Sequence, residues 1–224
     1  MYKIVIAVVL VIAYLPSICS AQSIPDAFGS IARIESESGR GTGFVVAKSG
    51  DKFELWTNAH VVRNQRTVTL RFFAGTTREF STPGIVVWSK YDGTRDAAKI
   101  ISTTGKEIRS FGIADQNCSS CIFATAGYPS GQRGYAILLS PTPRLDFGPV
   151  AAYVPSSIPG QSGSPVVDQD GTVTHVVTLR AKREGVMVGG ALPISHWADG
   201  DMFETSKGET GIGVFKPLPN APNK

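Results

Sequence analysis

Short apolar stretches rich in Val, Ile, Thr and aromatic residues recur along the chain, and Gly, Pro, Asn or Asp closes each of them. This pattern is typical of β-strands separated by turns. In "TVTLRFF", Val68, Leu70 and Phe72 share one face and the polar residues share the other, which predicts a strand with one buried face. The strands predicted in the first half are Ser30–Ile34, Gly43–Ala47, Phe53–Thr57, Thr67–Phe73, Gly84–Ser89 and Ala97–Ile101. Those predicted in the second half are Cys121–Ala126, Gly134–Leu139, Pro149–Val154, Ser164–Val167, Thr172–Leu179 and Val186–Leu192.

These strands fall into two sets of six on either side of a seam at residues 102–117. Such an arrangement favours an all-β fold, either two packed β-barrels or a sandwich. The one convincing helical segment is "HWADGDMF", which follows Ser195 as a candidate N-cap. Residues 205–224 are rich in Gly and Pro and are predicted to form a loosely held or disordered tail.

The first residues are typical of a secretory signal peptide. "MYK" is followed by an apolar run from Ile4 to Leu15 and then by "PSICSAQ", with small residues before a cleavage point after Ala21. A membrane anchor is the alternative, although the run is short for a bilayer span. We therefore expect residues 1–21 to be removed and the mature protein to be secreted or periplasmic, with no stable membrane anchor.

Charge and cysteine content narrow the choice of partners. Loss of Lys3 with the leader lowers the formal charge from +4 to +3, and no block of Lys or Arg indicates nucleic acid as a partner. Cys118 and Cys121 remain in "QNCSSCIF", and in an exported chain this spacing predicts a local disulfide. A redox pair would need a βαβ context, and a zinc site would need two further ligands, so we expect no metal.

The chain contains three histidines, so few residues could act as a general base. His60, in "LWTNAHVVRN", follows an apolar strand at a turn, where a side chain can be held at the edge of a cleft. Asp96, in "GTRDAAKI", directly precedes a short apolar segment and could become buried there. Asp92 is the rival carboxylate, but the Asp-Gly pair that it begins is itself a turn signature, so Asp96 is preferred.

Ser162 is flanked by Gly160 and Gly163 in "GQSGSP", and it is the candidate nucleophile. Acyl transfer by a serine needs an imidazole base, a carboxylate that orients it, and backbone N–H groups that face the developing oxyanion. The N–H groups of Gly160 and Ser162 are the candidates for this oxyanion hole. The order His60, Asp96, Ser162 matches one known chain order of the triad, whereas an α/β-hydrolase would place acid and histidine after the serine.

Six motifs occur in the order and rough spacing of the trypsin-like serine peptidases: "GTGFVV" (41–46), "TNAHVV" (57–62), "RDAA" (95–98), "AGYPSG" (126–131), "GQSGSPVVDQDG" (160–171) and "GGALPI" (189–194). The chain most resembles the bacterial branch with HtrA-type proteases and glutamyl endopeptidases. This resemblance implies that His60 is the base, Asp96 its orienting carboxylate and Ser162 the nucleophile. It also implies two packed six-stranded antiparallel β-barrels (chymotrypsin-like) with a short C-terminal helix. Residues 22–110 would form the first barrel and residues 111–204 the second. The active site would lie in the cleft between the two barrels.

The chain departs from these families at several points. Gln161 stands where they usually carry Asp or Asn, so activation by a new amino terminus that pairs with that Asp is not expected. Ala97 and Lys99 stand where the family usually has bulky aliphatic residues. No PDZ segment follows residue 197, so HtrA-style regulation and assembly are not implied. The trypsin-like disulfides are absent as well, apart from the predicted Cys118–Cys121 bridge.

In such enzymes the segment ahead of the serine and the strand after it line the substrate pocket. For this chain the resemblance implies that the pocket residues are Ser156, Ser157, His175, Val177, Thr178 and Arg180. The first segment has no carboxylate, which disfavours cleavage after Lys or Arg. His175 suggests a preference for glutamate, but the histidine of glutamyl endopeptidases falls two residues further on, at Val177. Small or uncharged residues are therefore favoured, and an interior position for His175 and a structural role for His196 are the simpler interpretations.

Together these observations predict a secreted serine endopeptidase that acts on a protein or peptide through an acyl-enzyme intermediate. The implied mechanism requires no cofactor. Two alternatives remain, a catalytically inactive binding module with the protease fold and an esterase or lipase. The sequence does not determine the oligomeric state.

Overall fold

The computed structural model describes residues 28–37, 39–92, 95–114, 123–129, 136–140, 145–147, 150–153, 159–168, 171–183 and 186–198. The predicted leader, Cys118, Cys121, Ser156, Ser157 and the predicted tail lie outside these residues. None of the helices within the described ranges has the length and apolar character that a membrane span requires.

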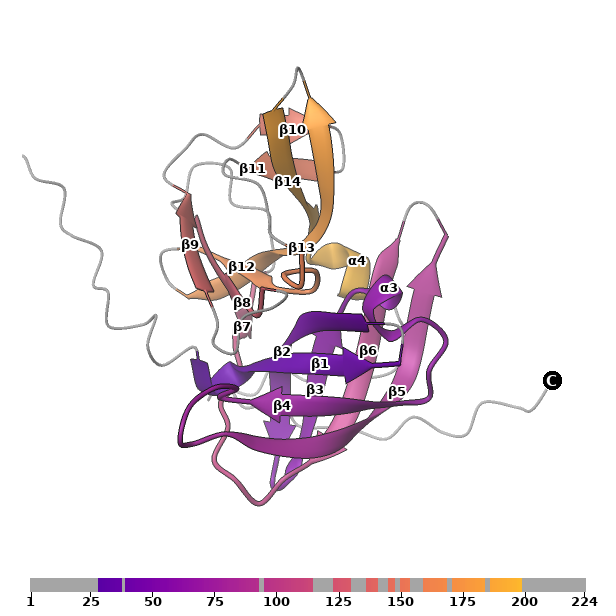
Figure 1. Ribbon diagram of the computed structural model, residues 1–224, viewed down its shortest axis with the longest axis vertical. Coiled ribbons are helices and arrows are strands. Elements are labelled where there is room, and N and C mark those ends of the chain that lie inside the picture. The colour runs from indigo at the N-terminus through magenta and orange to yellow at the C-terminus, as the bar shows by residue number, and fades with distance from the viewer. Residues whose placement is uncertain are drawn as a thin grey trace, which may run out of the picture.

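The first half of the chain folds into a closed antiparallel barrel, drawn in indigo to magenta in Figure 1. Its strand order is β1-β2-β3-β6-β5-β4. The strand β4 has the alternation expected from its sequence, with Val68, Leu70 and Phe72 buried inside the barrel. The strands are β1 (Ile31–Ser36), β2 (Gly39–Ser49), β3 (Lys52–Thr57), β4 (Thr67–Phe72), β5 (Phe80–Tyr91) and β6 (Asp96–Thr103). A 3-10 turn, η1 (Phe28–Ser30), precedes the barrel, and a single helical turn, α3 (Ala59–Val62), follows β3.

The second half forms an eight-stranded sheet with the path β10-β11-β14-β13-β12-β8-β9, and β7 pairs with β13. Its strands are β7 (Gly112–Ile113), β8 (Phe123–Gly127), β9 (Ala136–Ser140), β10 (Leu145–Phe147), β11 (Val150–Tyr153), β12 (Pro165–Val167), β13 (Thr172–Arg183) and β14 (Val186–Pro193). The short strands β7 and β10 are additions to the six predicted strands. A final helical turn, α4, spans Ser195–Ala198, so Ser195 is its first residue and not its cap.

The all-β prediction is confirmed, and the predicted seam falls where the barrel ends. The last barrel strand ends at Thr103 and the first strand of the second sheet begins at Gly112. Strands β2 and β5 are longer than predicted because residues beyond both predicted ends continue the pairing ladder. The turn α3 was not predicted, because four residues are too few to show a helical period.

Among the described residues, the two larger apolar clusters hold these elements in place. One fills the barrel, where the rings of Phe53, Phe72 and Phe80 are in contact. The other joins the two halves, because Phe44 and Trp56 of the barrel belong to the same buried cluster as residues of the second sheet and α4. Figure 1 shows α3 and α4 between the barrel and the second sheet, so the elements that meet at this boundary come from both halves of the chain.

Lys99 is buried on the outer face of β6, opposite to Ala98 and Ile100 in the barrel core. It pairs in register with Trp56 on β3 and Trp88 on β5, and its ammonium lies 5.3 and 5.8 Å from the two ring centroids. Glu54 is also buried and accepts a hydrogen bond from the Trp56 indole N–H. The two tryptophan rings therefore cover the Lys99 side chain and hold its charge between them.

We expect Lys99→Met to destabilise the fold more at about pH 7 than at about pH 5. Burial raises the pKa of the Glu54 carboxyl, while the Trp56 hydrogen bond and the Lys99 charge act in the opposite direction. A raised pKa means that the folded state binds the proton more tightly, so stability from this group falls as pH rises above the ordinary value of 4.5. Without the Lys99 charge, the free energy of unfolding should fall further as pH rises, by roughly 1–3 kcal/mol at neutral pH. This is the usual cost of a buried polar group that has lost its partner.

Urea unfolding midpoints at the two pH values measure this effect. Lys90→Met is the matched control, because Lys90 is an exposed lysine whose partner is the exposed Asp92. An equal loss of stability at both pH values for Lys99→Met would mean that only packing of its aliphatic chain matters.

Candidate active site

His60 lies in the short turn α3, directly after the end of β3. Its neighbours Ala59, Val61 and Val62 are buried, and the turn ends at Arg63 in the left-handed conformation (φ 31°). The His60 side chain remains 30% exposed. The apolar residues of "AHVV" thus anchor the turn in the barrel and leave the imidazole at the surface.

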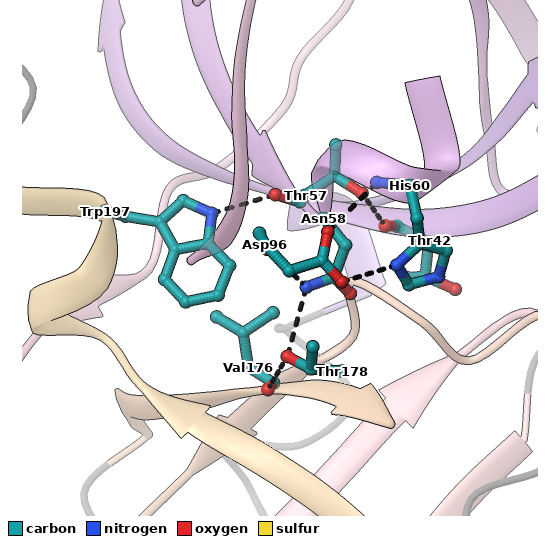
Figure 2. Close-up of polar contacts among 8 residues, drawn as sticks. All are labelled: Thr42, Thr57, Asn58, His60, Asp96, Val176, Thr178 and Trp197. Carbon is teal, nitrogen blue, oxygen red and sulfur yellow. Dashed lines mark hydrogen bonds and ion pairs between the residues drawn. The ribbon is translucent and has the colours of Figure 1, made fainter. Parts of the chain in front are cut away.

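Asp96 begins β6 and points both of its carboxylate oxygens at His60 (Figure 2). Oδ1 accepts the backbone N–H of His60 at 3.0 Å, and Oδ2 lies 2.6 Å from the imidazole Nδ1. A carboxylate accepts and cannot donate when ionised, so this contact places the imidazole proton on Nδ1 and leaves Nε2 free to accept one. The structure therefore brings together two of the three residues proposed from sequence as catalytic.

The rival carboxylate, Asp92, lies in the β5–β6 hairpin. It pairs with the Lys90 ammonium at 3.0 Å and accepts the backbone N–H of Arg95 at 2.9 Å. These are the contacts of a turn aspartate.

The Ser162 turn is held against the barrel by Thr42 of β2. The Thr42 N–H donates to the Ser162 carbonyl at 2.8 Å, and the Thr42 hydroxyl donates to the Gly160 carbonyl at 3.0 Å. The Thr42 carbonyl accepts a bond of 2.7 Å from the hydroxyl of Thr57, the last residue of β3. Thr42 thereby connects the candidate nucleophile's turn to the strand end that precedes His60. It lies in the quoted motif "GTGFVV", but nothing in a single sequence distinguishes its hydroxyl from that of any strand threonine.

Both glycines beside Ser162 adopt conformations that favour glycine, with φ 93° at Gly160 and 84° at Gly163. A methyl group at Gly163 would lie 2.1 Å from the Thr42 carbonyl oxygen and 2.3 Å from the Thr57 hydroxyl. Gly163 therefore permits close contact between the turn and the barrel. Ser162 itself is partly exposed, and Gln161 beside it is buried.

Asn58 and Trp197 also hold the site, and sequence reasoning did not single them out for it. The Trp197 indole N–H of α4 donates to the Thr57 carbonyl at 2.8 Å. The Asn58 amide donates to the Asp96 backbone carbonyl at 2.8 Å and to the Thr178 hydroxyl of β13 at 3.1 Å (Figure 2). The end of β3 is thus fixed from the second sheet and from the last helix.

The residues proposed for the substrate pocket are only partly described. His175 is fully buried, with Nδ1 3.0 Å from the Thr174 hydroxyl, which is the environment of an interior histidine. Val177 is buried in a cluster with Val166 and Ala191. Thr178 is buried and donates its hydroxyl proton to the Val176 carbonyl. Arg180 lies in β13, paired with Gly189, and Ser156 and Ser157 lie outside the described residues.

A family model described as trypsin-like peptidase domain matches residues 41–174, more than half of the chain, and this range contains His60, Asp96 and Ser162. No curated protein sequence matches the chain.

Solved structures of serine proteases are similar to the described fold. The inactive form of the Rv3671c protease of M. tuberculosis has a TM-score of 0.61 at 21% identity, over 81% of this chain and 91% of that one. The serine protease of a human pathogenic astrovirus has a TM-score of 0.55 at 22% identity, over 75% and 90%. The serine endoprotease of Yersinia pestis has a TM-score of 0.62 at 16% identity, over 81% of this chain and 64% of that one. At these identities the structures support the shared fold.

Proposed function

Because the chain belongs to the trypsin-like peptidase domain family, we propose that it is a secreted serine endopeptidase that uses His60, Asp96 and Ser162 as its catalytic triad. The observation that carries the proposal is the contact of 2.6 Å between His60 Nδ1 and Asp96 Oδ2, beside a Ser162 turn bonded to the same barrel through Thr42. The matched range spans all three proposed catalytic residues.

In the proposed reaction, the Ser162 Oγ attacks the scissile carbonyl carbon while His60 Nε2 takes its proton. Asp96 holds the imidazole in the required tautomer and stabilises the imidazolium that forms. The N–H groups of Gly160 and Ser162 stabilise the oxyanion of the tetrahedral intermediate. His60 then protonates the leaving amine, the C–N bond breaks, and water hydrolyses the acyl-Ser162 ester by the same steps with His60 again as base.

The substrates proposed are proteins or peptides. We propose that the segment ahead of Ser162, with Ser156 and Ser157, and the strand β13, with Arg180, form the substrate pocket. Thr178 is left out of this proposed pocket, because its side chain is buried and its hydroxyl is bonded to Asn58 and Val176. A preference for small or uncharged side chains is proposed because no carboxylate occurs in the segment ahead of Ser162. Secretion is proposed from the leader at residues 1–21.

Labelling with a fluorophosphonate tests this function. The reagent should form a bond from the Ser162 Oγ to phosphorus, with loss of fluoride, in the folded wild-type protein. His60→Ala should slow labelling and peptide hydrolysis by about 10³-fold or more, because the serine loses its proton acceptor. Mass spectrometry of tryptic peptides locates the modified residue, and a peptide library measures turnover.

Folded wild-type protein that neither reacts with the reagent nor cleaves any peptide would exclude the enzyme and favour the inactive binding module. Labelling together with hydrolysis of esters but not of peptides would favour the esterase.

A further inference from the structure

Asn58 occupies the N-cap position of α3 but does not cap it. Its backbone angles (φ −80°, ψ 148°) are those of an N-cap residue, yet its side chain makes no capping hydrogen bond. The Asp96 carboxylate accepts the backbone N–H of His60 instead. The side chain that would ordinarily stabilise this helical turn is therefore used elsewhere, and the residue that replaces it is the proposed triad carboxylate.

The Asn58 amide joins the backbone of Asp96 to the second sheet. Nδ2 donates both of its bonds, to the Asp96 carbonyl and to the Thr178 hydroxyl, and Asn58 is fully buried. The Asp96 carbonyl can only accept, so the nitrogen must face it and the amide orientation is determined. The Thr178 hydroxyl in turn donates to the Val176 carbonyl at 2.9 Å. Figure 2 shows this series of bonds beside the contact between His60 and Asp96.

We propose that Asn58 is a positioning residue that ties the orientation of the Asp96–His60 pair to strand β13. The inference rests on the proposed function, in which His60 is the base. Asn58 precedes His60 by two residues and bonds the residue that orients it, so loss of the amide frees the start of β6 to shift. A displacement of the imidazole by a fraction of an ångström is enough to misalign a proton transfer.

A merely structural role and a positioning role predict different results. If the amide only stabilises the fold, its loss lowers the melting temperature and leaves turnover per folded molecule unchanged. If it positions Asp96, turnover falls while substrate binding is nearly unchanged, because the amide is buried and contacts no substrate. The proton between His60 Nδ1 and Asp96 reports the alignment directly by NMR, in an active or an inactive protein.

The experiment compares Asn58→Ala, Thr178→Val and the double variant, with Thr82→Val as the matched control on β5, where the Thr82 hydroxyl donates to the Thr103 carbonyl. We expect each single variant to lower kcat by about 10- to 100-fold with KM within about twofold. The kcat of the double variant should be no lower than that of the slower single variant, because both substitutions remove the same hydrogen bond between Asn58 and Thr178. The Nδ1 proton resonance should shift or broaden in all three, and Thr178→Ser, which keeps the hydroxyl, should restore it.

An unchanged Nδ1 resonance in folded Asn58→Ala, or kcat losses that multiply in the double variant, would overturn the proposal. If Asn58→Ala does not fold, Thr178→Val alone decides, because it removes the same link with a side chain of nearly the same shape. A wild-type protein that shows the resonance but does not react with a fluorophosphonate would refute the proposed function, while the shift of the resonance would still decide the role of Asn58.

Discussion

Ser162→Ala is expected to lower peptide hydrolysis by about 10³- to 10⁶-fold and to abolish fluorophosphonate labelling. The hydroxyl of Ser162 is the only atom of the proposed triad that forms a covalent bond with the substrate. The partly exposed Ser162 lies in a turn that the barrel holds through Thr42, and loss of one hydroxyl leaves those backbone bonds intact. Initial rates on a peptide substrate and the mass of the labelled protein measure the effect.

The matched control is Ser164→Ala, two residues along the same motif. Ser164 is fully buried, and its hydroxyl makes no hydrogen bond to any of the described residues. Alanine at this position should therefore fold, react with the fluorophosphonate and cleave peptides at close to the wild-type rate. Labelling that survives in Ser162→Ala and disappears in Ser164→Ala would mean that Ser164 is the nucleophile and that the assignment of Ser162 is wrong.

Asp96→Asn is expected to lower kcat by about 10⁴-fold while the protein still folds. The carboxylate accepts two N–H groups of His60, one from the backbone and one from Nδ1. An amide that offers its NH₂ group to the ring would favour the tautomer with the proton on Nε2, which cannot take the proton of Ser162, and would no longer stabilise the imidazolium. The steady-state rate on a peptide substrate, corrected for folded protein by circular dichroism, measures the loss.

Asp92→Asn is the control for this substitution, because it makes the same chemical change in the same hairpin. Asp92 pairs with Lys90 at the surface and caps the turn through the Arg95 N–H. Its loss should cost less than about 1 kcal/mol of stability, as exposed pairs do, and leave kcat unchanged. Equal losses of activity in the two variants would mean that hairpin conformation and not the contact with His60 is responsible.

The choice between these two aspartates shows how far local sequence rules reach. Asp92 begins an Asp-Gly pair and lies in the hairpin turn, whereas Asp96 precedes an apolar segment and is the first residue of β6. Both positions were inferred correctly because turn chemistry and strand patterning depend on residues only a few positions apart. The same local rules predicted the alternation of β4 and the all-β fold.

The contacts that build the site could not be predicted in this way, because they join residues far apart in the chain. Asn58 and Thr178 are separated by 120 positions, Thr42 and Gly160 by 118, and Thr57 and Trp197 by 140. Nothing in the sequence near Asn58 indicates that its amide leaves its own helical turn uncapped and bonds β13. The N-cap preference for asparagine even predicts the opposite.

The sequence by itself determined the elements and the types of residue available for chemistry. The period of two along the strands and the glycines on either side of Ser162 are properties of short segments, and the order of histidine, aspartate and serine can be read from the linear sequence. Tertiary structure alone decided which polar groups meet, since closing the barrel and packing the second sheet bury groups such as Asn58, Thr42 and Thr178 where each must find a partner. Those partners come from whichever strands the fold brings within about 3 Å of one another, and that proximity is a property of the whole packed chain.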